Sequence, residues 1–162
     1  VPAVYATGID RGRLARTRDA LVLAVRSVRE GLLVLSALSI PVTPSRLRIL
    51  HWLPEPVLVA LLALAQKRRE MDVALMGHAS AARDEVKYLA DEFRVLTRLS
   101  GVPTPASDRL YQYLDSSTPL MPDGSKEIPL RWAGVGLVVA LATVVLIGLG
   151  LLGWLLKTVR RL

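Results

Sequence analysis

The sequence contains no cysteine and only two histidines, His51 and His78, among its 162 residues. Without cysteine, neither disulfide bonds nor thiolate chemistry can contribute. The His, Asp and Glu residues have no metal-ligand spacing, and no serine lies in a nucleophile-elbow sequence. We therefore expect no metal site and no hydrolytic triad. We expect His51 to make an ordinary packing contact with its neighbour Trp52.

A strand-like alternation of apolar and polar residues is also missing over any useful length. Apolar residues instead recur at helical spacing, and prolines and glycines separate the helical stretches. The expected helices are Leu14 to Leu38, Thr43-Pro44 to Trp52, Val57 to about Gln66, Arg69 to Ser100 with Gly101 as its C-terminal cap, and Ala106 to Leu114. The sequence therefore predicts an all-α fold, a helical bundle followed by one transmembrane helix.

Positive charge is in excess, with a formal net charge of +7. Before Arg131 the chain has fourteen acidic and seventeen basic residues, a net charge of +3, and the other four basic residues flank the C-terminal apolar run. A basic strip with interleaved aromatic residues, which is typical of nucleic-acid binding, is absent. We expect no nucleic-acid partner.

Charge of either sign is missing from the twenty-five residues Trp132 to Leu156. A helix of this length rises about 1.5 Å per residue and covers the roughly 30 Å hydrocarbon core of a bilayer. Residues suited to the lipid headgroup layer lie at both ends of the run: Arg131, Trp132, Trp154, Lys157, Arg160 and Arg161. We expect a single-pass helix in the cell membrane; the alternative is a buried helix of a soluble protein.

Small residues recur within this run. Gly136 and Ala140 are four apart, with Thr143 about one turn further, a spacing that allows close approach of another transmembrane helix. The alternative is that small residues are simply common in such helices. We do not expect the pattern GxGxxG at residues 148–153 to be a dinucleotide site, because that fingerprint needs a following helix and an acidic residue about twenty positions on, and nine residues follow it in this sequence.

The expected organisation has five parts: an irregular lead-in (1–12), a helical domain (13–115), a linker rich in Pro, Ser and Gly (116–130), the transmembrane helix (131–157) and a basic tail (158–162). The first residue is Val1 rather than methionine, which suggests processing or an incomplete N-terminus.

The densest polar cluster covers residues 81–93. Glu85, Tyr88 and Glu92 are spaced to share one side of a helix, and by this pattern alone they form a solvated face. After Glu85 come a glycine, Gly101, a Val-Pro-Thr-Pro turn and a closing helix that contains Arg109-Leu110-Tyr111. Upstream lie Arg29-Glu30-Gly31 and Ala37-Leu38-Ser39-Ile40.

This order resembles the C-terminal domain of ketopantoate reductases (2-dehydropantoate 2-reductases) over roughly residues 20–115. The resemblance implies the substrate-side domain of an NADPH-dependent reductase, in which Glu85 binds the substrate and orients it for hydride transfer. The nucleotide-binding domain and the catalytic lysine of the family have no counterpart here, and Lys87 occupies the position of a usual aspartate. This chain alone is therefore expected to bind no cofactor, and NADPH would need a further domain.

Three functions fit these observations. The chain is a membrane-anchored part of a ketopantoate-reductase-like enzyme, a non-catalytic accessory subunit that docks in a membrane complex through its helix, or a generic tail-anchored adaptor. The basic tail favours a domain outside the cytoplasm, whereas the resemblance and the C-terminal position of the run favour a cytoplasmic domain. We therefore expect the soluble domain to be cytoplasmic.

Overall fold

The computed structural model describes residues 2–66, 82–136, 139, 140, 143 and 147. Every regular element within these residues is helical, which confirms the all-α class. The elements are α1 (Pro2–Ala6), α2 (Arg11–Arg16), α3 (Arg18–Ala37), η1 (Ser45–Arg48), α4 (Ile49–Trp52), α5 (Glu55–Ala65), α7 (Arg83–Ser100), α8 (Pro105–Tyr111) and η3 (Gln112–Leu114).

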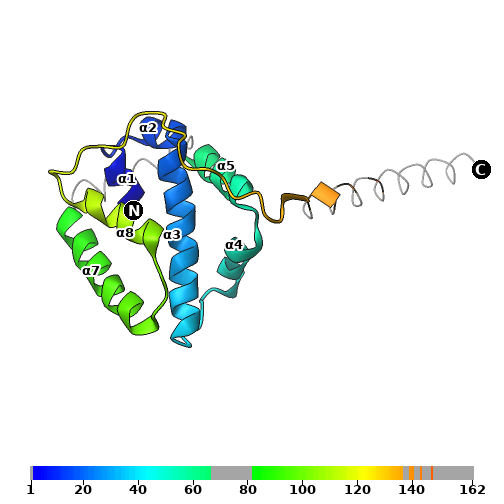
Figure 1. Cartoon of the computed structure of the whole chain (residues 1–162), viewed down its shortest axis with the longest axis horizontal. Coiled ribbons are helices and arrows are strands. Elements are labelled where there is room, and N and C mark those ends of the chain that lie inside the picture. The colour runs from blue at the N-terminus through cyan, green and yellow to red at the C-terminus, as the bar shows by residue number, and fades with distance from the viewer. Residues whose placement is uncertain (1, 67–81, 137–138, 141–142, 144–146, 148–162) are drawn as a thin grey trace, which may run out of the picture.

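The longest helix, α3, runs through the middle of the domain (Figure 1). Helices α7 and α8 lie on one side of it, and α4 and α5 lie on the other. Residues 19–23 of α3 are all buried, so this end of the helix is covered on every side, and Val25 and Val34 are buried further along. Burial all round is typical of a helix packed between neighbours, as α3 is.

The N-terminal residues are part of the core, and the prediction of an irregular lead-in over residues 1–12 is wrong. Residues 2–6 form α1, in which Tyr5 is almost fully buried, and Asp10 caps α2 by accepting a hydrogen bond from the Arg13 backbone N–H at 2.8 Å. A helix of five residues is not stable by itself in water, so local propensity alone does not explain α1. Its packing against α3 and α8 stabilises it. The expected single helix from Leu14 to Leu38 is likewise divided at Thr17.

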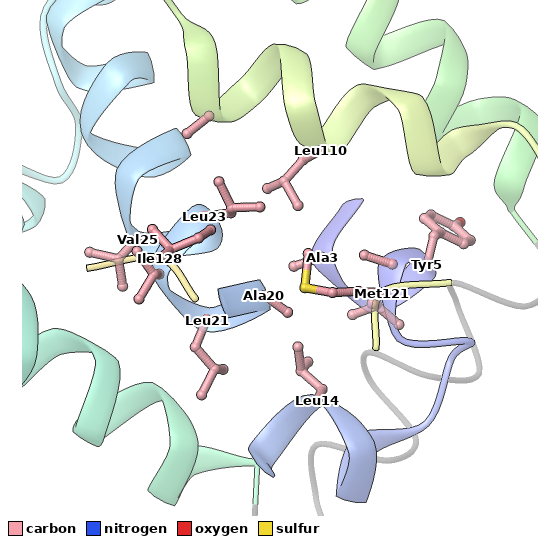
Figure 2. Packing of buried hydrophobic residues seen from close by; sticks show 14 of the residues in the cluster. Ala3, Tyr5, Leu14, Ala20, Leu21, Leu23, Val25, Leu110, Met121 and Ile128 are labelled. Carbon is pink, nitrogen blue, oxygen red and sulfur yellow. The ribbon is translucent and has the colours of Figure 1, made fainter. Parts of the chain in front are cut away.

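The segment predicted as a linker is packed against the helices. We name residues 119–131 the strap; it crosses from the α7 and α8 side, past α2, to the side of α5 (Figure 1). Figure 2 shows Met121 and Ile128 of the strap among side chains of α1, α2 and α3, where both are buried. The strap has no regular secondary structure, but it is packed against the helical domain.

The remaining boundaries agree with the predictions in part. Helix α7 ends at Gly101, whose φ of 66° is the left-handed conformation expected of a glycine cap. The short helix expected to open at Thr43-Pro44 begins instead at Ser45, as η1, with Pro44 at its N-cap position. Of the predicted segment from Arg69 to Ser100, residues 69–81 lie outside the described residues, as does His78.

Most of the predicted transmembrane segment also lies outside the described residues, including Trp154, Lys157, Arg160 and Arg161. Within the described part of the chain, no single helix has the length and apolar character needed to cross a bilayer. Among the described residues, the segments Ser45–Trp52 and Glu55–Ala65 have enough length and apolar character only when taken as a pair, and the chain bends by 120° between them.

Candidate functional site

Three carboxylates tie distant parts of the chain to the central helices. Glu55, at the start of α5, is 1% exposed and accepts two hydrogen bonds of 2.9 Å from Arg26 of α3. Its Oε1 also accepts a hydrogen bond of 2.9 Å from the Arg131 backbone N–H. Burial raises the pKa of Glu55, but the Arg26 and Arg131 hydrogen bonds and charges outweigh it and leave the pKa below its ordinary value.

The second carboxylate, Asp19 of α3, holds the middle of the strap. Its two oxygens accept hydrogen bonds from the backbone N–H groups of Glu127 at 2.9 Å and Ile128 at 3.0 Å. On α2, Arg16 forms a bidentate pair with Asp123 of the strap at 2.7 Å. The strap is therefore fixed at several points up to Arg131, the last charged residue before the apolar run.

The third carboxylate, Glu30 of α3, caps α8. It accepts hydrogen bonds from the Ala106 and Ser107 backbone N–H groups, both at 2.8 Å, and from the Ser107 hydroxyl at 2.7 Å. In the sequence, Glu30 belongs only to the stretch that carries the family resemblance, and no motif includes Asp19 or Glu55. Neither has a sequence signal of its function, because each partner lies far away in the chain.

The start of the apolar run lies next to α4. A Cβ at Gly134 would be 3.8 Å from the Pro54 side chain, and Pro54 follows the last turn of α4. This corner of the molecule exposes large apolar side chains: Ile49 is 57% exposed, Trp52 81% and Trp132 65%. The predicted contact of His51 with Trp52 is present, edge-on at 6.0 Å, but both rings are exposed to solvent.

The predicted helix-packing residues lie at helical positions with exposed surfaces. A Cβ added at Gly136 would meet no atom within 4 Å, and both Ala140 and Thr143 are exposed. The Thr143 hydroxyl donates a hydrogen bond of 2.9 Å to the Val139 carbonyl. All three positions are exposed within the described part of the chain.

A mainly apolar cleft of about 370 Å³ lies between α3, α7 and α8. Val28 and Gly31 of α3, Phe93 of α7 and Tyr111 of α8 are among its lining residues. Glu85, predicted to bind substrate, is exposed on the first turn of α7 and does not line this cleft. Glu85 is therefore next in sequence to a lining residue, Val86, but does not itself line the cleft.

Lys87 of α7, which replaces the family's aspartate, belongs to a polar cluster at the same cleft. Its Nζ lies 3.0 Å from Asp91 and donates a hydrogen bond of 3.3 Å to the Tyr111 hydroxyl, which itself donates to Asp91. The hydrogen bond to Asp91, followed by that to Tyr111, raises the pKa of Lys87. A lysine held protonated in this way does not act as a base near neutral pH.

The described residues contain no group of three or more His, Asp or Glu side chains that could hold a metal ion. Their strongest ionic contacts join helices to the strap and to each other, which is a structural arrangement. No protein-family model, curated protein or solved structure matches this chain, so the resemblance to ketopantoate reductases rests on the residues of the sequence alone.

Proposed function

We propose that this chain is a membrane-tethered helical domain that serves as an accessory subunit of a larger membrane assembly. The observation that carries the proposal is the corner where the apolar run starts: Gly134 lies against Pro54, between α4 and α5, and Trp52 and Trp132 are both exposed. Large exposed apolar side chains bordered by basic ones, here Arg46, Arg48 and Arg131, are typical of a surface that meets lipid headgroups.

The strap supports close attachment of the domain to the bilayer. Arg131 is the last residue before the apolar run, and its backbone is bound to Glu55 in the domain. No flexible spacer therefore separates the domain from the first residue of the proposed span. A domain held this way keeps a fixed orientation toward neighbouring membrane proteins, which suits docking better than the capture of a soluble substrate.

Trp52 provides the first test, because it lies on the proposed lipid-facing corner. In the full chain with Trp132→Phe and Trp154→Phe, Trp52 is the sole tryptophan. In vesicles, its emission should shift to shorter wavelength and be quenched by brominated lipid. The matched control carries Trp52→Phe as well and places the reporter at Tyr88→Trp, an exposed position of α7 on the other side of α3, where quenching should be absent. Equal quenching at both positions, or at neither, would contradict the lipid-facing corner.

The span itself is tested by Leu141→Arg with Leu146→Arg, placed in the middle of the apolar run. Each charge costs about 2.5–3.5 kcal/mol at the centre of a membrane helix. The unmodified chain should resist carbonate extraction from membranes, and the double variant should be extracted.

The accessory role is tested by the size of the assembly in mild detergent. Gly136→Leu should release the chain from its complex on a native gel, because a large side chain prevents close helix approach. Val139→Leu, a conservative change in the same helix, should leave the complex intact. An unmodified chain that migrates only as a monomer would sink the accessory role.

A second candidate function is the substrate-side domain of a ketopantoate-reductase-like enzyme. One observation favours it: Glu85 and the cleft between α3 and α7 are both open to a further domain that would cover them. Extending the reading frame upstream discriminates the two proposals. A nucleotide-binding domain and NADPH oxidation with ketopantoate, lost in Glu85→Gln, would establish the enzyme.

A further inference from the structure

Arginine side chains converge on a second cavity, distinct from the cleft at α7. This cavity of about 320 Å³ lies between α3, the start of α8 and the end of the strap. Four arginines line it: Arg26, Arg29, Arg109 and Arg131. The only acidic residue in its lining is Glu30.

The two carboxylates at this cavity are already occupied. Glu30 accepts three hydrogen bonds from α8, and Glu55, which lies behind the lining, is paired with Arg26. Four guanidinium groups therefore share two carboxylates, and within the described part of the chain neither carboxylate accepts a hydrogen bond from the Arg109 or Arg131 side chain. The cavity carries a net positive charge of about two, counting each group at its usual charge.

The arginines divide into two that support the fold and two that are free to bind. Arg26 donates to Glu55 and to the Pro129 carbonyl, and Arg29 donates to the Leu50 and Leu53 carbonyls. The side chains of Arg109 and Arg131 are exposed and make no hydrogen bond or ion pair within the described part of the chain.

The positive charges around the cavity affect the pKa of Arg29, one of its lining residues. Burial lowers the pKa of Arg29, Glu55 opposes this effect, and the nearby charges of Arg131 and Arg26 lower the pKa further. Like charges are thus held close together in this cavity. Such an arrangement is stabilised when an anion enters.

We propose that this cavity binds the phosphate group of an anionic ligand, with Arg109 and Arg131 as its direct contacts. A guanidinium group offers a planar fork of N–H donors that matches phosphate oxygens. Arg26 and Arg29 contribute charge, and the apolar side chains of Leu23, Leu33 and Ile128 form the remaining wall. Because Arg131 precedes the apolar run directly, the cavity lies at the level expected for lipid headgroups if the run spans the bilayer.

Two sources can supply this phosphate, an anionic lipid headgroup or a soluble phosphate. The lipid source rests on the proposed membrane attachment, whereas the soluble source does not. Carbonate extraction tests attachment separately, so failure of the anchor and failure of the phosphate site give different results.

The experiment measures ligand binding to the purified full chain in neutral detergent. Native mass spectrometry counts retained phosphatidylglycerol against phosphatidylcholine, and a thermal-shift titration compares inorganic phosphate with chloride at equal ionic strength. If only phosphatidylglycerol is preferred, the ligand of the cavity is a lipid headgroup. If only inorganic phosphate stabilises the protein, the ligand is a soluble phosphate. If both bind, the cavity recognises the phosphate group itself.

Arg109→Gln and Arg131→Gln should each weaken the preferred ligand about tenfold, since a charge-assisted hydrogen bond is lost. Arg109→Lys keeps the positive charge but loses the planar fork of N–H donors, so it should weaken ligand binding less than Arg109→Gln does. Arg98→Gln on α7 removes the same charge far from the cavity and should change nothing. The proposal is overturned if neither phosphate ligand is preferred, or if Arg98→Gln weakens binding as much as the cavity variants do.

Discussion

Glu55 is a buried charge that the fold can tolerate because both of its carboxylate oxygens accept hydrogen bonds. Removing a carboxylate from water costs several kcal/mol unless hydrogen bonds and an opposite charge compensate it. Arg26 supplies both, and the backbone N–H of Arg131 supplies a third hydrogen bond. The same residue therefore joins α3, α5 and the end of the strap.

We predict that Glu55→Gln lowers the free energy of unfolding by about 3 kcal/mol at neutral pH, because it leaves Arg26 without its partner. The pKa of Glu55 is below its ordinary value of 4.5 in the folded state. Its stabilising contribution is therefore complete above the unfolded pKa and is lost as pH falls through the lower folded value. Urea unfolding at neutral pH and at successively lower pH measures both effects.

The unmodified and Glu55→Gln proteins should thus converge in stability as pH falls below about 4.5. Glu92→Gln, an exposed change on α7, should remain within about 0.5 kcal/mol of the unmodified protein. A constant difference between the Glu55 variant and the unmodified protein at all pH values would show that the charge of Glu55 is not the source of the stability.

At the scale of elements, capping comes from both local and distant residues. Asp10 caps α2 from an adjacent position, and Gly101 ends α7 locally through its positive φ. Helix α8 has no side-chain cap from its own N-terminal residue, Thr104. Glu30, seventy-six residues from Ala106, performs that function and fixes α8 against α3.

We predict that Glu30→Ala loosens α8 and costs about 1–2 kcal/mol, because two backbone N–H groups lose their acceptor. Hydrogen exchange at the amides of Ala106 and Ser107 should accelerate more than exchange in α5. Asp108→Ala, an exposed change in the first turn of α8, is the matched control and should leave both amides protected. Unchanged protection in the Glu30 variant would mean that packing alone holds α8.

At the scale of the whole molecule, the strap makes the domain larger than its helices suggest. Met121 and Ile128 complete the core, and backbone hydrogen bonds join the strap to α1 at Ala6 and to α3 at Asp19. The fold therefore extends to Arg131 rather than ending near residue 115.

We predict that a chain ending after Arg131 unfolds cooperatively, whereas one ending after Asp115 does not. The shorter chain loses two buried apolar side chains, each contributing about 2–5 kcal/mol, which approaches the total stability of a small domain. Thermal unfolding followed by circular dichroism distinguishes the two. Met121→Ala with Ile128→Ala in the longer chain should lower the midpoint strongly, and the exposed change Leu120→Ala should lower it little. Two-state unfolding of the shorter chain would restore the linker interpretation.

Periodicity and breakers in the sequence determined the class of the fold and most of α3, α5, α7 and α8. These features act over one or two turns, so local spacing reveals them. The apolar run from Trp132 to Leu156 is also a property of the sequence alone, and its interpretation as a membrane span stays a prediction.

Only the tertiary structure decided which residues near the ends of the domain belong to it. Helix α1 and the strap carry too little local signal, because their stability comes from burial against α3 and α8. The pairings of Asp19, Glu30 and Glu55 also join positions far apart in the chain. A long-range contact forms only when the chain has folded, and no spacing rule along the sequence encodes it.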